Sequence, residues 1–208
     1  MIKIENIDVY GFEAAIRGAR NPMNSWHLMD SCYNNGEFEI GENDYKLLKN
    51  LTIAGPEHRK WNRMVTVTMD ITAPLYWWKE FDTYKVGTVA NSCSTMHKIQ
   101  AKKFEMRDFS IEHLSSSSLM NMIIFDLNFY RDNFNKTKDK EYWWQMIQLL
   151  PTSYNQKRTV HLNYEVLVTI YHQRKHHKLD EWHVFCDTIK TLPYSEFITR
   201  EFGDKDDM

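Results

Sequence analysis

The segment from Lys79 to Lys85 and the residues after it hold side chains that could bind a phosphate group. Two lysines and a tyrosine are followed by Thr88, Asn91 and Ser94. Lysine supplies a point charge, hydroxyl groups donate hydrogen bonds, and Gly87 allows backbone amides to come close to a ligand. The same composition is also typical of an ordinary polar loop, so both interpretations stay open at this point.

A second candidate set consists of Asn163 and Arg174, which stand 11 residues apart. Within one helix this spacing is about three turns, so both side chains would lie on nearly the same face, roughly 16 Å apart. Such a face could flank an extended heterocyclic ligand, because arginine offers planar, bidentate donation to a carbonyl or a phosphate. The helix dipole alone also favours an arginine near a helix C-terminus.

Histidine and cysteine side chains are the remaining candidates for chemistry. His172 and His176 have the i, i+4 spacing that could place two imidazoles on one metal ion. No acidic or thiol ligand accompanies them at a recognised spacing, so a solvated helix end is the simpler interpretation and we predict no metal site. Cys93 is the only cysteine inside a candidate site, and we interpret it as a buried or lining thiol.

The composition of the 208 residues limits the class of protein. Hydrophobic residues make 42% and charged residues 26%, which is typical of a globular chain with a substantial core. The net charge of -2 offers no general attraction to nucleic acid or anionic lipid. No uncharged stretch reaches the roughly 20 residues that span a bilayer, and no signal peptide is evident. We therefore expect a cytoplasmic protein without membrane contact, and the net charge disfavours a nucleic-acid partner.

The elements that must position these side chains follow from hydrophobic periodicity and from Gly and Pro breaks. We predict strands over 2–10 and 64–72, the second with one wetter face. Helices are predicted over 12–20, 45–54, 75–81, from a boundary at 115–118 onward, 142–150 and 155–178. The segment 24–42 is polar and irregular. We expect one helix-rich α+β domain over 1–208, with a frayed tail over 203–208.

Taken together, these segments resemble the flavin-dependent thymidylate synthases. That family carries R-H-R-x-x-S-x-N-E-x-S-x-R after a strand that ends in a turn often containing Ala-Pro, and here Ala73-Pro74 stands in that place. Thr83, Tyr84 and Lys85 occupy the Arg-His-Arg positions. With one extra residue, Thr88, Asn91 and Ser94 fall on Ser, Asn and Ser of the motif, whereas its Glu and final Arg are missing.

The C-terminal half of the resemblance is closer to the family pattern. Leu150-Pro151 precedes a segment with Asn163 and Arg174, and the interval between these two residues agrees with the family without a gap. Glu165 stands where the family has a basic residue, and Thr169 where it has an amide. The resemblance covers about two thirds of the chain in order.

The resemblance implies a fold with a small, mostly antiparallel sheet and a homotetramer with active sites at subunit interfaces. FAD would be the cofactor and dUMP the substrate, with methylenetetrahydrofolate and NADPH as co-substrates, so the flavin would carry the redox and one-carbon chemistry. Arg174 would hold the pyrimidine and stabilise negative charge. The other implied contacts are Glu80, Lys85 and Ser94 with the nucleotide and Tyr84, Lys85, Thr88, Asn91 and Asn163 with FAD.

Two other classes of function stay open. The missing motif arginines take cations away from a nucleotide site, and removing one charge-assisted hydrogen bond costs about 1.5 to 3 kcal/mol. A non-catalytic or altered-specificity pyrimidine nucleotide-binding protein on the same scaffold is therefore one alternative. A single-stranded nucleic-acid binder is another, using Trp77, Trp78, Trp143 and Trp144 for base stacking.

Overall fold

The computed structural model describes residues 2–203, and these residues divide into two compact units. Unit 1 comprises 2–5, 70–83 and 90–159, and unit 2 comprises 6–69, 84–89 and 160–203. The strands are β1 (Lys3–Tyr10), β2 (Cys32–Asn34), β3 (Glu37–Glu39), β4 (Thr66–Pro74), β5 (Val89–Ser92) and β6 (Asn155–Asn163). The helices are α1 (Phe12–Arg20), α2 (Glu42–Ala54), α3 (Leu75–Phe81), α4 (Ser118–Thr137), α5 (Lys140–Leu149), α6 (Tyr164–Arg174), α7 (Asp180–Lys190) and α8 (Glu196–Thr199).

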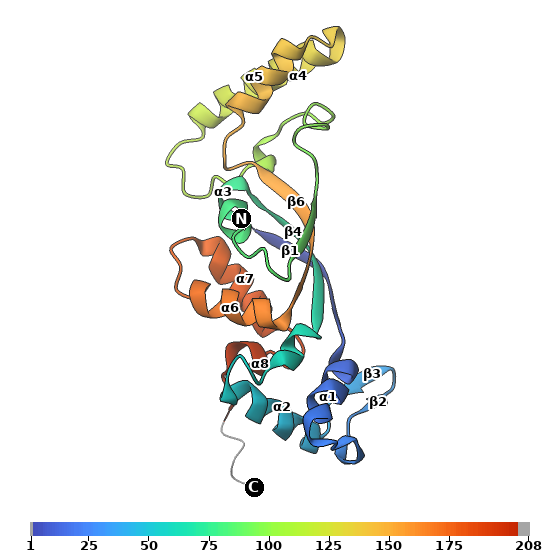
Figure 1. The fold of residues 1–208 in the computed structure, drawn as a ribbon. Coiled ribbons are helices and arrows are strands. Elements are labelled where there is room, and N and C mark those ends of the chain that lie inside the picture. The colour runs from blue at the N-terminus through green and yellow to red at the C-terminus, as the bar shows by residue number, and fades with distance from the viewer. Residues whose placement is uncertain (1, 204–208) are drawn as a thin grey trace. The chain divides into compact units, whose positions relative to one another are not determined.

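A four-stranded sheet with the strand order β1-β4-β6-β5 is the main β structure (Figure 1). All four strands of this sheet contribute residues to both units. The sheet is small and antiparallel and helices dominate the chain, so the predicted α+β class is confirmed. A single domain over the whole chain stays a prediction.

Strand β4 has the two unlike faces that its sequence predicts. In unit 2, Val67 and Met69 are buried, whereas Thr68 between them is half-buried and its Oγ1 lies 2.9 Å from Nδ1 of His161. In unit 1, Asp70 accepts a 2.6 Å hydrogen bond from the Thr159 hydroxyl. One face of this strand therefore carries hydrogen-bonding side chains, while the other packs into the core.

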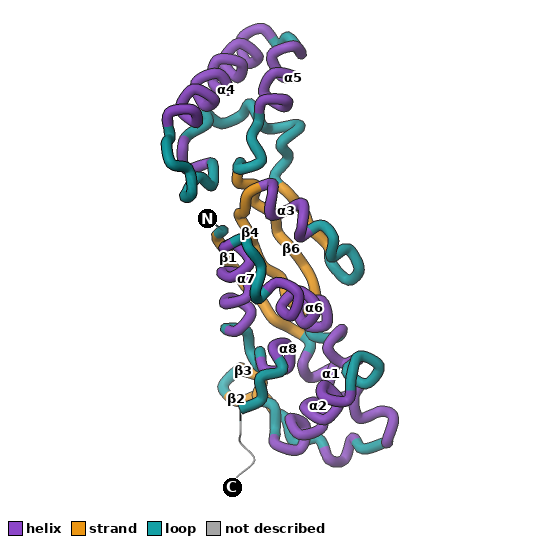
Figure 2. The backbone as a smooth tube through the Cα atoms, turned by 90° about the vertical axis from the view of Figure 1, so that its left-hand side faces the viewer, coloured by secondary structure: helices purple, strands orange, loops and turns teal. Residues whose placement is uncertain are grey.

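Unit 1 combines the short helix α3 with a helical hairpin. Pro74 precedes α3, and the helix buries Trp77, Trp78 and Phe81, as predicted. The Trp78 indole N–H donates a 3.0 Å hydrogen bond to the carbonyl of Gln156 on β6. Helices α4 and α5 lie side by side in both views (Figures 1 and 2) and share a cluster of buried residues. That cluster consists of Ile99, Phe104, Phe109, Met120, Leu127 and Met146.

Unit 2 packs α6 against α7 and α8 (Figure 2). Tyr164, Trp182 and Phe197 are fully buried and fill the space among these helices. A buried ion pair links α1 to α2, because the Arg20 guanidinium lies 2.6 Å from the Asp44 carboxylate. The predicted helix over 12–20 agrees with α1, and α2 begins three residues before the predicted start at Tyr45.

The helix predicted over 155–178 is wrong before Tyr164 and after Arg174. Residues Asn155–Asn163 form strand β6, and α6 begins only at Tyr164. Gln156, Val160 and Leu162 are buried at even spacings, which is the period of a strand. Val160 and Tyr164 also stand four residues apart, so the end of the strand and the start of the helix together imitate one helical stripe.

Two further predictions concern the segment 24–42 and the C-terminal tail. The segment predicted as irregular, 24–42, includes the hairpin β2–β3, in which Tyr33 pairs with Phe38. Of the tail predicted to fray, only Gly203 belongs to the described residues, and 204–208 lie outside them. Within 2–203 no helix is long and apolar enough to cross a membrane.

Candidate functional site

The predicted site residues fall into two sets, one in each unit. Tyr84, Lys85, Thr88, Asn163 and Arg174 belong to unit 2, and Glu80, Asn91 and Ser94 belong to unit 1. Each set is described by itself. Convergence of the two sets in one active site stays a prediction.

Arg174, the last residue of α6, lies in an aromatic surround within unit 2. Its Nε donates a 2.8 Å hydrogen bond to the Tyr84 hydroxyl, which in turn donates to Oε1 of Gln173 at 2.9 Å. The guanidinium carbon lies 4.9 Å from the centre of the Trp182 ring and 5.6 Å from that of Tyr84. These distances are within the range of cation–π attraction. Tyr84 and Trp182 therefore fix the direction of the guanidinium of the predicted catalytic residue.

The loop from Tyr84 to Val89 passes close to the N-terminus of α6. Gly87 has a φ of +78°, and a Cβ added there would lie 3.0 Å from Nδ2 of Asn163 and 3.2 Å from Cγ2 of Val166. Glycine is therefore required both by the backbone conformation and by the close approach. The Asn163 side chain caps α6, because its Oδ1 accepts from the amide of Val166 at 3.1 Å. Its Nδ2 consequently points its donors toward the loop.

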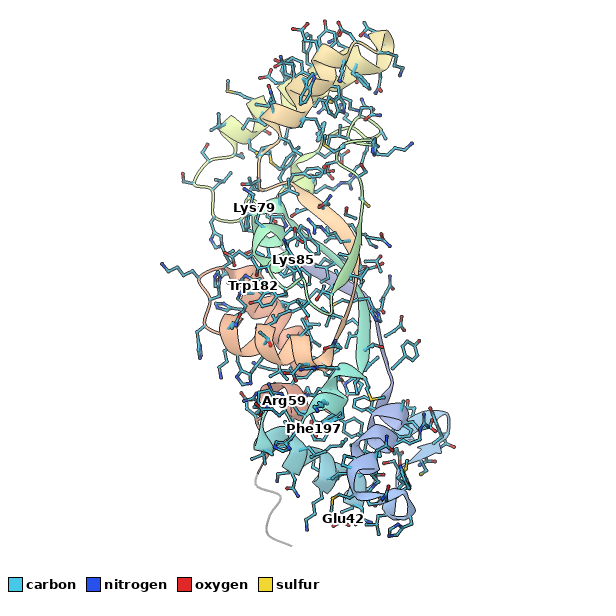
Figure 3. The ribbon with its side chains drawn as sticks, viewed as in Figure 1. Glu42, Arg59, Lys79, Lys85, Trp182 and Phe197 are labelled. Atoms are coloured by element: carbon cyan, nitrogen blue, oxygen red, sulfur yellow. The ribbon has the colours of Figure 1, made fainter. Side chains whose placement is uncertain are left out.

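Thr88 and Lys85 complete the unit 2 set. The Thr88 hydroxyl is buried and has no hydrogen-bond partner among the described residues. The Lys85 side chain is exposed, and Figure 3 labels it together with Trp182. A buried hydroxyl without a partner is unusual in a folded protein, so Thr88 is suited to contact a bound group.

The unit 1 set lies on α3, on β5 and after β5. Glu80 is half-buried, Asn91 is exposed, and Ser94 is half-buried with its Oγ accepting a 3.0 Å hydrogen bond from the His97 amide. Ser94 and Cys93 line a pocket of 410 Å³ that we call the lysine pocket. Cys93 is exposed there, in agreement with the interpretation as a lining thiol.

The lysine pocket carries more positive than negative charge. Lys98, Lys102 and Lys157 line it, and Asp108 is the one acidic residue in its described lining. Nζ of Lys102 lies 2.6 Å from Asp108 Oδ1. Nζ of Lys157 lies 3.0 Å from Asp70 Oδ2, outside the pocket lining. The exposed Lys98 and the Ser94 hydroxyl thus offer an anion a charge and a hydrogen-bond donor in one place.

Two arginines with structural roles near the predicted site residues were not found from the sequence. Arg158 on β6 stacks on Trp78, with its guanidinium carbon 4.2 Å from the ring centre, and pairs with Asp82 at 2.7 Å. Arg158 was missed because the sequence pattern predicts a helix at this position, and a helix would bring residue 158 next to different side chains than strand β6 does. Arg59 forms a bidentate pair with Glu165 at 2.7 and 2.9 Å. These partners are 106 residues apart, so no local pattern could join them.

The remaining candidates are the histidines and the tryptophans. Burial, and after it the charge of Arg200, lowers the pKa of His172, which favours the neutral imidazole. No group of three or more side chains within 2–203 could hold a metal ion. Trp77 and Trp78 are core residues that expose 0% and 1% of their surface, so they cannot stack on a nucleic acid, whereas Trp143 is half-buried and Trp144 is 44% exposed.

Comparison with known proteins defines the fold. No family profile matches the sequence, and no curated protein matches it. Thymidylate synthase X from Helicobacter pylori, solved with FAD and dUMP, superimposes with a TM-score of 0.70 over 95% of this chain and 96% of that chain at 14% identity. A second structure of that enzyme with FAD and dUMP gives a TM-score of 0.66 over 93% of this chain and 96% of that chain, also at 14% identity.

The UMP/dUMP methylase PolB from Streptomyces cacaoi, bound with 5-Br dUMP, is also similar. Its TM-score is 0.62 at 13% identity, over 98% of this chain and 96% of that chain. The chain therefore has the fold of the flavin-dependent thymidylate synthases. At such low identity this likeness establishes the fold, and activity has to be argued from the residues.

Proposed function

We propose that the protein is a divergent flavin-dependent thymidylate synthase, which methylates dUMP to dTMP with methylenetetrahydrofolate and NADPH through bound FAD. The observation that carries this proposal is the arrangement of Arg174, Tyr84 and Trp182 beside the loop that approaches Asn163, on this fold. A homotetramer and a cytoplasmic location belong to the same proposal, because the family resemblance implies the one and the composition favours the other.

The unit 2 residues fit a flavin nucleotide. The buried Thr88 hydroxyl lacks a partner among the described residues. The Asn163 amide faces the loop at Gly87, a residue that has no side chain to block the approach of a ligand. The exposed Lys85 offers a charge for a phosphate, and Val166 offers an apolar contact for a ring. FAD, when bound, would supply the electron transfer and carry the one-carbon unit.

The protein's own contribution would be to bind and polarise the uracil. Tyr84 and Trp182 hold the guanidinium of Arg174 in one orientation, so the cation needs no rearrangement to stabilise negative charge on the pyrimidine. Ser94 and Lys98 in the lysine pocket are suited to the nucleotide phosphate, with Glu80 and Asn91 as further predicted contacts. In this proposal lysines supply part of the charge that the missing motif arginines would have supplied.

Absorption spectroscopy of the purified protein tests the proposal. We expect a flavin band, FAD released on denaturation and identified by mass spectrometry, and product from dUMP in an assay that also includes UMP and dCMP. Arg174→Ala should weaken the flavin band and abolish product. Arg107→Ala is the matched control, because Arg107 is an exposed arginine of unit 1. A colourless protein that takes up no FAD on titration would refute the proposal.

The alternative is a pyrimidine nucleotide-binding protein without catalysis. It is favoured by Thr83, Tyr84 and Lys85 in place of the Arg-His-Arg triplet and by Glu165 in place of the basic residue of the family pattern. Tight binding of dUMP by a colourless protein that makes no product would support this alternative.

A further inference from the structure

The turn from Arg59 to Asn62 in unit 2 concentrates buried polar atoms that have no partner. Nη1 of Arg59, Nε1 of Trp61 and both side-chain polar atoms of Asn62 make no hydrogen bond within the described chain. Arg59 is 5% exposed and Asn62 is 0% exposed, so both side chains are almost fully withdrawn from solvent. Folded proteins rarely leave such groups unsatisfied, and several of them in one short turn indicate a missing partner.

Arg59 is held in a fixed direction by the carboxylate of Glu165. Its Nε and Nη2 donate to the two carboxylate oxygens at 2.7 and 2.9 Å, which leaves Nη1 as the third nitrogen of a guanidinium that cannot rotate. Trp61 anchors the turn in the core, since its ring packs edge-on against Phe197 with the ring centres 4.9 Å apart (Figure 3 labels Arg59 and Phe197). The donor is therefore pre-oriented.

The charges around this pair do not cancel. Arg200 follows α8 and interacts electrostatically with both Arg59 and Glu165. The charge of Arg200 therefore acts on both members of the pair. Burial, and after it the charge of Arg200, lowers the pKa of His172 and favours its neutral form. Arg59 repels Arg200, and an anion between the two would remove this repulsion.

The position of the pair connects it with the candidate site. Glu165 lies in the first turn of α6, two residues after Asn163. The family pattern has a basic residue at position 165, and here Arg59 brings a guanidinium to the same turn from a different part of the chain.

We propose that Arg59 and Arg200 form a phosphate-binding subsite at the first turn of α6, which rests on the proposed function. Arg200 is exposed and offers the first contact, and Arg59 completes the binding with Nη1. The phosphate belongs to a nucleotide ligand of the protein, either the substrate monophosphate or the pyrophosphate of the cofactor. Arg59 thereby replaces a cation that is missing from the sequence motif.

Calorimetric titration of the wild type and matched variants tests the subsite. Glu165→Gln keeps the Arg59 charge, whereas the double variant Arg59→Gln/Glu165→Gln removes it without leaving a buried carboxylate unpaired. Each protein is titrated with dUMP and deoxyuridine and with FAD and riboflavin. Arg200→Gln gives a second, exposed probe that does not disturb the core. Arg17→Gln is the control for removal of an exposed arginine.

We expect Glu165→Gln to bind the phosphorylated ligand at least as tightly as the wild type. The double variant should bind it roughly tenfold to a hundredfold more weakly than Glu165→Gln, and Arg200→Gln should also bind more weakly than the wild type. The unphosphorylated ligands should bind all variants alike. The pair that shows the effect, dUMP with deoxyuridine or FAD with riboflavin, identifies the source of the phosphate.

Equal affinity of the double variant and Glu165→Gln for every phosphorylated ligand, in proteins with the same circular dichroism, would overturn the subsite and leave the proposed function intact. If the wild type binds neither dUMP nor FAD, the proposed function fails, and inorganic pyrophosphate becomes the probe. Thermal stabilisation by pyrophosphate that disappears in the double variant would then uphold the subsite, and stabilisation that is absent or unchanged would refute it.

Discussion

Asp44 is fully buried, and its carboxylate accepts hydrogen bonds from Arg20, from the Ser31 hydroxyl and from the backbone amides of Asp30 and Ser31. Burial by itself raises the pKa of this carboxyl, but the hydrogen bonds from Ser31 and Arg20 outweigh it and hold the pKa below its ordinary value of 3.8. The ionised form therefore stabilises the folded state of unit 2.

Replacement of Asp44 by Asn should lower the free energy of unfolding by about 3 to 5 kcal/mol, because it leaves Arg20 buried without its counter-ion. The folded pKa lies below the unfolded value, so the contribution is fully present above pH 3.8 and is lost as the pH falls through the folded pKa. Urea unfolding of both proteins at pH 7 and at successively lower pH measures this difference. A difference that stays constant as the pH falls well below 3.8 would contradict the assignment.

Tyr84 shows how a single hydroxyl can position another side chain. Tyr84→Phe removes the group that accepts from Arg174 and donates to Gln173, so we expect weaker flavin binding and a loss of about 0.5 to 1.5 kcal/mol in stability. Flavin titration and urea unfolding measure the two effects. Tyr10→Phe serves as the control because Tyr10 is 65% exposed. Unchanged flavin affinity would show that the hydroxyl does not position Arg174 for the ligand.

At the scale of elements, the junction of β6 and α6 places the site. Asn163 ends the strand and begins the helix, so its side chain serves both as a cap and as a neighbour of the loop at Gly87. The sequence predicts α1, α3 and the alternation of β4 because each has one uninterrupted period and clear Gly or Pro ends. The prediction fails at β6, because α6 follows this strand without a loop. The sequence therefore has no Gly or Pro break where the hydrophobic period changes from that of a strand to that of a helix.

Two substitutions of Asn163 separate these two roles. Asn163→Asp keeps an oxygen that accepts from the Val166 amide but removes the Nδ2 donor, so stability should be retained while flavin binding weakens. Asn163→Ala removes both the oxygen and the Nδ2 donor, so we expect weaker flavin binding and a free energy of unfolding lower by about 1 kcal/mol. Thermal unfolding and flavin titration of the two variants give the comparison. Equal flavin affinity in Asn163→Asp and the wild type would exclude the amide as a ligand contact.

At the scale of the whole molecule, the two units share strands. β1, β4, β5 and β6 each have residues in both units, so neither unit has a complete four-stranded sheet of its own. We expect one cooperative unfolding transition in urea, with circular dichroism and tryptophan fluorescence giving the same midpoint. Two separated transitions would show that the units unfold independently and would count against the single domain predicted from the sequence.

Sedimentation of the purified protein tests the expected assembly. The family resemblance implies a homotetramer, so we expect a mass of four chains that does not change on dilution through the micromolar range. A monomer at all concentrations would argue against active sites built from several subunits. It would leave the Arg174 cluster untouched, since the contacts of Arg174 with Tyr84 and Trp182 lie within unit 2 of one chain.

The α+β class and most helix positions could be predicted from the sequence alone, because they depend on local periodicity and on capping residues. The pairing of residues that are distant in the sequence is seen only in the folded chain. Arg59 meets Glu165, Arg20 meets Asp44 and Tyr84 meets Arg174, and in each case the partners are far apart along the chain. Such pairs form where packed elements bring charges together, and no linear pattern encodes that meeting.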